Sequence, residues 1–333
     1  MTPALPLRRG LPKVGLCFAA LLAALAVAPF IGSTHVSIAR ALDASVPFDR
    51  NVDAQILLIS RLPRALAAAF VGGTLAAAGV VFQGLLRNPL ATPYTLGVSA
   101  GASLGAMIAI TFAALLPVGG VAAASLAGAT LAVAVVYALA RARHRGLSTT
   151  VLLLAGVTLN SFFSALILFV QYRSDFAETY RALRWLMGDL DVSGYAPLLA
   201  ALPLALLAFA TFAWLARPLN LLSLGADAAS TRGVPVARTQ RLAFFSASLA
   251  TGAAVSVGGP IGFVGIIVPH LVRLLVGSDH RLVLPASACF GAAFLVLCDV
   301  VARTVIAPLE LPVGIITALV GGPFFLWLLL RRR

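Results

Sequence analysis

Long apolar runs, repeated along the whole chain, limit the possible folds more than any other feature. A helix needs about 20 mainly apolar residues to cross the hydrocarbon core of a bilayer, and run after run here reaches about 18 or more. Of 333 residues, 61% are hydrophobic and 11% are charged. Soluble globular domains carry roughly twice that share of charged residues. We therefore expect an all-α polytopic membrane protein.

The runs predict about ten transmembrane helices in a single domain over residues 1–333. Arg8, Arg9 and Lys13 precede the first run, as in a signal peptide, but no small-residue cleavage site follows cleanly, so we expect an uncleaved helix. Arg217 and Pro218 are expected to end the sixth helix. The expected ranges are 14–31, 62–84, 95–116, 120–140, 149–170, 195–215, 241–258, a short helix reaching 270–273, 283–302 and 313–330.

The net charge of +13 is distributed unevenly along this predicted order. One side receives most of the arginines and only two acidic residues, Asp227 and Asp279, which under the positive-inside rule marks it as cytoplasmic and places both termini there. Nucleic-acid binding is not expected, because Lys13 is the only lysine and no basic patch is interleaved with aromatic residues. The basic residues assigned to the cytoplasmic side are Arg8, Arg9, Lys13, Arg87, Arg141, Arg143, Arg145, Arg217, Arg232, Arg238, Arg241, Arg273, Arg281 and Arg331 to Arg333.

Residues 61–105 read as two membrane helices joined by a tight polar turn. Glycines recur at spacings of four within them, which lets helix backbones approach closely in lipid. Asn88 and Pro89 break the helix where backbone groups would otherwise be left unpaired, so the turn must be buried in protein or line a cavity.

The motifs in this stretch and near the C-terminus resemble the permease family that imports iron chelates (siderophores and haem) and cobalamin through ATP-binding-cassette transporters. The resemblance spans roughly residues 55–330 and implies a type II importer permease fold. It rests on the joint order of motifs, each of which is weakly specific alone. The matching segments are Arg61-Leu-Pro-Arg64, Gln83, Asn88-Pro-Leu-Ala91 with Pro93, Leu96 to Ala102, the Leu-Leu-Leu-Ala-Gly-Val run ending at Val157, Gly259 to Arg273, Asp279-His-Arg281 and Leu311 to Thr317.

The resemblance also implies the assembly: a second copy of the chain, two ATPase subunits and a periplasmic substrate-binding protein, in a bacterial inner membrane. The sequence contains no GxxxxGK[ST] motif, the sequence that binds ATP phosphates in a P-loop. We therefore expect that this chain is not an enzyme and binds no cofactor. ATP and magnesium are expected to bind to the partner ATPase. The cargo stays open among cobalamin, haem and ferric siderophores.

Arg61, Arg64 and Arg303 fall on the outer side, against the prevailing charge bias. The ordinary explanation is interfacial snorkelling. The resemblance implies instead that they form salt bridges with acidic residues of the binding protein.

On the inner side, residues 219–240 form the longest soluble-looking stretch, with a short helix expected over 222–231. It is either a solvated loop or, as the resemblance implies, the coupling loop that docks into the ATPase. The residues assigned to coupling are Leu222, Leu224, Gly225, Ala228, Arg232 and Gly233.

The cytoplasmic gate and the pathway are assigned from neighbouring segments. The resemblance places the gate at the polar turn and at the start of the fifth helix, on Asn88, Leu90, Ser148, Thr149 and Thr150. The fifth helix carries weakly polar groups that are expected to line the pathway, at Thr158, Asn160, Ser161 and Ser164.

Two other classes of function fit the sequence less well. An ion-coupled secondary transporter acting without an ATPase would need carboxylates at mid-membrane, whereas Asp299 and Glu310 lie close to an interface. An intramembrane enzyme would need motifs such as HExxH or GxSxG, which are absent from the sequence. His270 could touch a chelate but is more simply structural, and Cys17, Cys289 and Cys298 sit in apolar runs as packing residues, so no metal site is expected.

Overall fold

The computed structural model describes residues 7–32, 34–43, 45–112, 120–143, 149–192 and 194–331. Within these ranges the chain is helical throughout and forms no strand. Seven helices are long and apolar enough to cross a membrane, and three shorter apolar helices accompany them. The predicted all-α fold with about ten membrane helices is confirmed.

The elements follow the predicted order closely. The membrane-length helices are α1 (Leu7–Val27), α4 (Leu62–Leu86), α6 (Gly120–Arg143), α7 (Thr149–Tyr172), α9 (Ala196–Leu222), α11 (Val236–Gly258) and α13 (His280–Ala302). The shorter helices are α2 (Ile38–Ala41), α3 (Val52–Gln55), α5 (Val98–Thr111), α8 (Phe176–Leu186), α10 (Ala226–Ser230), α12 (Val264–Val276) and α14 (Val313–Arg331). Four further turns of helix are η1 (Ala28–Phe30), η2 (Phe48–Arg50), η3 (Ile56–Arg61) and η4 (Pro93–Leu96).

Helix α4 forms the centre of the bundle and is buried on all sides for most of its length. It packs against α9, α11, α12 and α13. Gly72 meets the backbone at Gly291 of α13, and Gly79 meets the backbone at Gly265 of α12, so closely that a Cβ atom at either position would collide with a carbonyl group. The glycine spacing predicted from the sequence thus serves backbone-to-backbone packing around α4.

Helix α9 differs from its predicted end. It continues through Arg217 and Pro218 and stops at Leu222. A proline removes one backbone donor from the helix ladder, but Leu215, Leu219 and Leu222 are buried along one face of α9. This packing holds the last turns helical despite the proline.

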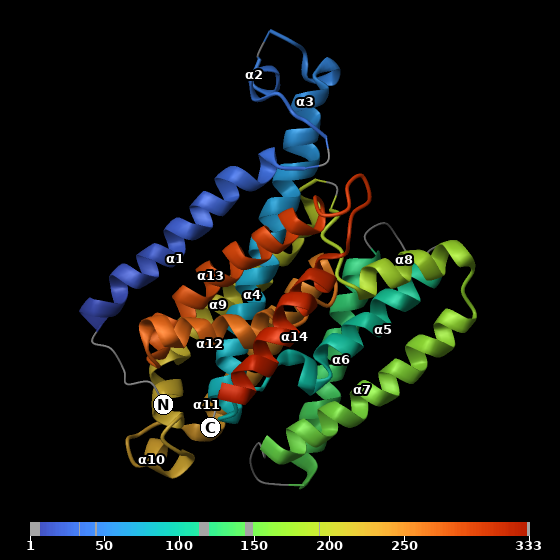
Figure 1. Cartoon of the computed structure of the whole chain (residues 1–333). Coiled ribbons are helices and arrows are strands. Elements are labelled where there is room, and N and C mark those ends of the chain that lie inside the picture. The colour runs from blue at the N-terminus through green and yellow to red at the C-terminus, as the bar shows by residue number, and fades with distance from the viewer. Residues whose placement is uncertain are drawn as a thin grey trace.

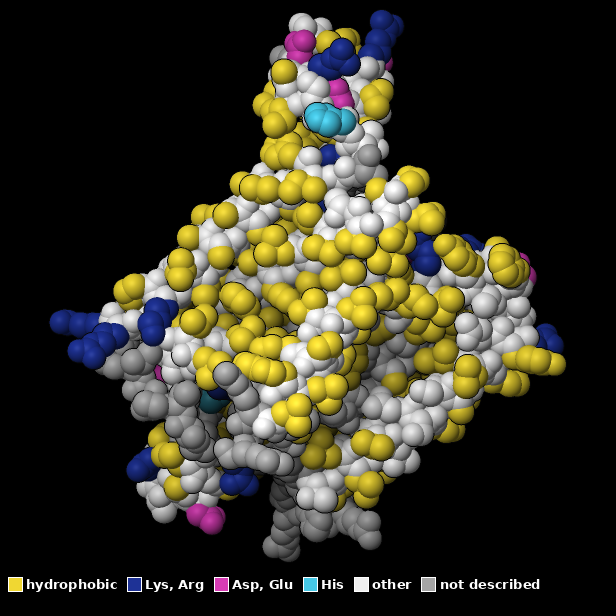
Figure 2. Space-filling model, in the orientation of Figure 1, with side chains coloured by type: hydrophobic (Ala, Val, Ile, Leu, Met, Phe, Trp, Pro, Cys, Tyr) yellow, Lys and Arg dark blue, Asp and Glu magenta, His cyan; other side chains and the backbone are white. Residues whose placement is uncertain are grey.

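Figure 1 shows how the helices are arranged. Helices α2 and α3 lie at one end of the bundle, while α10 and the last turn of α14 lie at the opposite end. In Figure 2 apolar side chains cover the middle of the face shown, and charged side chains gather toward the top, the tip where α1 begins and the region around α10. This distribution fits a bundle whose middle faces lipid.

Candidate functional site

A cluster of charged side chains lies where the outer ends of α4 and α13 meet. The Arg64 guanidinium donates from Nε to Asp299 Oδ1 at 2.9 Å and from Nη1 to Glu310 Oε2 at 2.5 Å. Arg303, one turn beyond Asp299, places its Nε 3.6 Å from Asp299 Oδ2. Arg64, Asp299 and Arg303 are buried, whereas a third of the Glu310 side chain stays exposed.

Arg303 and a further arginine, Arg61, hold the segment that follows α1. Arg303 Nη2 donates to the Ala28 carbonyl at 2.8 Å. Arg61, also buried, donates from Nη1 to the Pro29 carbonyl at 3.2 Å and from Nη2 to the Thr34 carbonyl. The cluster therefore ties together the outer ends of α1, α4 and α13 and the stretch that leads into α14.

Arg61, Arg64 and Arg303, which the sequence analysis assigned to docking of the binding protein, are buried in the chain on its own. They are 6%, 8% and 3% exposed, and all three hydrogen-bond within the chain. Within the chain, Asp299 and Glu310 supply carboxylates to Arg64. Those acids are far from Arg64 in sequence, so spacing alone could not reveal the pairing.

Helix α7 exposes three of the four residues assigned to the pathway. Thr158, Ser161 and Ser164 are exposed and share one side with Leu154 and Phe162. Two of these hydroxyls are bonded back to their own helix: Thr158 Oγ1 donates to the Leu154 carbonyl at 2.9 Å, and Ser161 Oγ donates one turn back at 3.3 Å. The exposed side of α7 is thus an apolar surface with a stripe of weakly polar groups.

Asn160 is half-buried and, unlike the three exposed hydroxyl residues, bonds to another element. Its Nδ2 donates to the Tyr94 carbonyl at 2.7 Å. Residues two positions apart on a helix do not share a face, and this alone separates Asn160 from Thr158. Tyr94 in η4 in turn donates its hydroxyl to the Ile261 carbonyl at 2.5 Å. Tyr94, which the sequence analysis did not single out, therefore joins α7 to the break between α11 and α12.

The polar turn after α4 has the geometry of a helix stop. Arg87 adopts a left-handed conformation with φ of 50°, and Asn88 Oδ1 accepts from the Leu90 backbone N at 2.9 Å. Leu90 is 43% exposed. Of the other residues assigned to the gate, Thr149 and Thr150 begin α7, and Ser148 lies outside the described residues.

The helix in the coupling segment is shorter than the one predicted over 222–231, because α10 covers only Ala226–Ser230. Gly225 separates it from α9 with a φ of 119°, a backbone conformation that favours glycine. Leu222 belongs to α9 and is buried, as is Ala229, while Ala228 is half-buried.

The two leucines assigned to coupling lie in different environments. Leu222 packs into the chain, while Leu224 projects from it with 60% of its surface exposed. Arg232 and Gly233 are exposed after α10, and Gly233 has a φ of 81°. A side chain at Gly225 would meet the Arg87 guanidinium at 4.0 Å, so the coupling segment and the polar turn are neighbours.

A second polar cluster joins the inner ends of α9 and α13. Asp279 caps α13, pairs with Arg281 at 2.7 Å and accepts from Asn220 Nδ2, also at 2.7 Å. Burial raises the pKa of Asp279, but hydrogen bonds from Arg281 and Asn220 outweigh it and lower the pKa to about 2. Asn220 Oδ1 also lies 2.7 Å from His280 Nδ1. Asn220 was missed in the sequence because it carries no charge and fits no motif, yet it anchors α9 just before the coupling segment.

A polar link also runs between α4 and α12. Arg273 donates to Gln83 Oε1, and Gln83 Nε2 donates to the Gly265 carbonyl at 3.0 Å. Both residues lie in motifs quoted above, but their pairing across 190 positions is visible only in the fold.

The chain is similar to known proteins of one family. The model of the FecCD transport family matches residues 19–331. The chain belongs to this family. Among relatives, the cobalamin import permease BtuC of Halobacterium salinarum is 48% identical over 82% of this chain and 72% of its own length. The haemin transport permease HmuU of Yersinia pestis is 41% identical over 84% of both chains.

A solved structure supports the FecCD fold. A protein described as a metal-chelate type ABC transporter in an inward-facing conformation has a TM-score of 0.85 and 33% identity, and the match covers 96% of this chain and 99% of that one. This FecCD chain is thus a permease subunit of the ATP-binding-cassette importer class, and the resemblance inferred from the motifs is confirmed. The individual roles of the docking, coupling, gate and pathway residues stay predictions.

Proposed function

We propose that this permease pairs with a second copy of itself and with two ATPase subunits in a bacterial inner membrane, receives a metal chelate from a periplasmic binding protein, and releases it to the cytoplasm. The observation that supports this most is the exposed side of α7, where Thr158, Ser161 and Ser164 form a weakly polar stripe on an otherwise apolar surface. Such a lining offers a bulky ligand no tight site, which suits release.

The cargo is a chelate of the cobalamin, haem or ferric siderophore kind. Relatives are named for cobalamin, haemin and ferric dicitrate, and they match this chain at 48%, 41% and 40% identity. Of these, cobalamin is our first candidate because that relative is the most similar of the three. ATP and magnesium are bound by the partner ATPase, and this chain holds no cofactor of its own.

An uptake assay tests both statements. The permease, its ATPase and the neighbouring binding protein are reconstituted in liposomes and supplied in turn with labelled cobalamin, haemin and ferric dicitrate. We expect ATP-dependent accumulation of one chelate, with cobalamin ahead. Accumulation driven by an ion gradient without ATP would instead support the secondary transporter.

The buried carboxylates give no support to ion coupling. Within the described ranges, Asp279 and Asp299 are the buried acids, and each is paired with an arginine near an end of α13. A proton relay needs carboxylates that can change their protonation within the membrane.

A further inference from the structure

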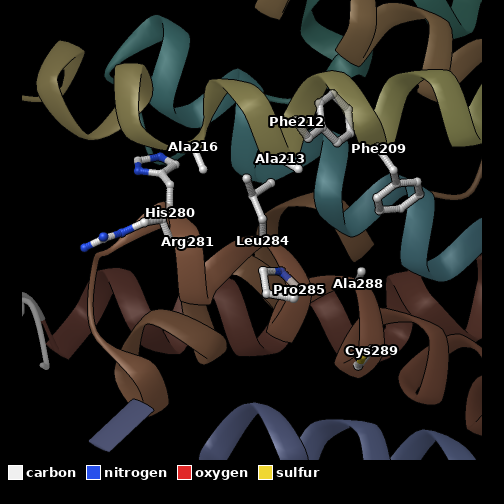
Figure 3. Close-up of a pocket in the computed structure, with 10 residues that line it drawn as sticks. All are labelled: Phe209, Phe212, Ala213, Ala216, His280, Arg281, Leu284, Pro285, Ala288 and Cys289. Atoms are coloured by element: carbon white, nitrogen blue, oxygen red, sulfur yellow. The ribbon is translucent and has the colours of Figure 1, made fainter. Parts of the chain in front are cut away.

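A cavity of about 450 Å³ lies between α9 and α13, close to their inner ends. Its walls come from both helices, as Figure 3 shows, and are mostly apolar, with His280 and Arg281 at the inner end. The apolar residues include Phe209, Ala213 and Ala216 on α9 and Leu284, Pro285 and Ala288 on α13. This volume falls within the range of about 300–1,000 Å³ that is typical of sites for small ligands.

Short side chains create the cavity. Ala213, Ala216 and Ala288 leave room where a larger residue would fill the space between the helices. Ala213 and Pro285 are exposed, so the cavity opens to the outside of the bundle. On α9 the opening is flanked by Trp214 with 56% of its surface exposed. In a bilayer this opening faces lipid rather than water.

Positive charge stands at the inner rim of the cavity. Arg281 lies one turn before Pro285, is exposed, and forms an ion pair with Asp279. Arg217 lies one turn beyond Ala213 and is also exposed. None of the ion pairs in the described part of the chain includes Arg217. Two arginines thus flank the opening, and only one carboxylate, that of Asp279, offsets their positive charge.

We propose that this cavity binds one acyl chain of an anionic phospholipid from the inner leaflet, with the lipid phosphate at Arg217 and Arg281. An apolar cavity that opens to the bilayer is suited to a hydrocarbon chain, and a basic rim between transmembrane helices on the cytoplasmic side is suited to an anionic headgroup. A free phosphate ion could meet the rim but would leave the cavity walls unused. The site goes beyond the transport function proposed above and does not depend on which chelate is carried.

Headgroup selectivity is the first test. The full-length permease, with the subunits that copurify, is incubated in detergent with phosphatidylglycerol or phosphatidylcholine of identical acyl chains, and retained lipid is counted by native mass spectrometry. The parent should retain phosphatidylglycerol preferentially. Arg217→Gln should lower that preference about fivefold, as expected for the loss of one basic residue beside an anionic lipid. Arg238→Gln, which removes an exposed arginine from α11, should not.

Filling the cavity is the second test. Ala213→Phe should reduce retention of both lipids, whereas Ala200→Phe, at an exposed position elsewhere on α9, should leave it unchanged. Inorganic phosphate at millimolar excess should not displace the lipid. The proposal is overturned if Arg217→Gln keeps the parental preference, if Ala213→Phe retains as much lipid as Ala200→Phe, or if phosphate removes the lipid. Since Arg217 is exposed, its variant remains informative even where Ala213→Phe fails to fold.

Discussion

Asp299 is the residue on which the outer cluster depends, since its carboxylate lies against both Arg64 and Arg303. Removing one partner from a buried ion pair leaves an uncompensated charge, which costs about 3–5 kcal/mol. We expect Arg64→Gln to lower the thermal unfolding midpoint of the purified permease strongly. Asp299→Asn should lower it as well, because Arg64 and Arg303 both lose this carboxylate.

Arg50 provides the matched control for this experiment, because it is an exposed arginine at the same end of the bundle. Arg50→Gln should leave the midpoint close to the parental value, as exposed charges contribute at most about 1 kcal/mol. Equal midpoints for Arg64→Gln and Arg50→Gln would show that the outer cluster does not stabilise the fold.

Asp279 makes the stability of the inner cluster depend on pH in a direction that its pKa determines. Its pKa in the folded chain is about 2, below the ordinary value of 3.8, so folding favours the ionised carboxylate. The stabilisation is complete above the ordinary value and is lost as the pH falls from there toward about 2. Between these limits the parent should lose more thermal stability than Asp279→Asn, which has no carboxylate to protonate at this position. Parallel melting curves for the two proteins would rule out the linkage.

At the scale of elements, the short segment around α10 carries the proposed coupling to the ATPase. Leu224 is its most informative residue, since this apolar side chain is 60% exposed. Leu224→Glu should leave folding unchanged but place an unpaired carboxylate in the interface with the ATPase, at a cost of several kcal/mol in the unfavourable limit. Copurified ATPase and ATP-dependent uptake should both fall.

Variants of Ser230 and Ala229 in the same segment distinguish an effect on coupling from an effect on folding. Ser230→Glu introduces the same charge at an exposed position of α10 and should retain the ATPase. Ala229 is fully buried, so Ala229→Glu should destabilise the permease itself. Normal ATPase stoichiometry and uptake in Leu224→Glu would remove this segment from the coupling interface.

The sequence predicted elements far better than it predicted pairings between them. Apolar length and glycine spacing were enough for the helix order around α4, because each depends on residues close together in the chain. The end of α9 was misjudged because burial of Leu219 and Leu222 outweighs the break expected at Pro218. The pairing of Arg64 could not be predicted because its partners, Asp299 and Glu310, lie more than 200 positions away.

For the molecule as a whole, the central prediction is its orientation in the membrane. Helices α2 and α3 and helix α10 lie at opposite ends of the bundle (Figure 1), and the positive-inside rule assigns the α10 end to the cytoplasm. Single cysteines at Arg50 and Asp227, both exposed, would report the two ends once Cys17, Cys289 and Cys298 are replaced by alanine. A membrane-impermeant maleimide added to intact spheroplasts should label Arg50→Cys alone, and permeabilised cells should label both. Labelling of Asp227→Cys in intact spheroplasts would show that the predicted topology is wrong. It would also contradict the assignment of α10 to the ATPase and of the lipid cavity to the inner leaflet.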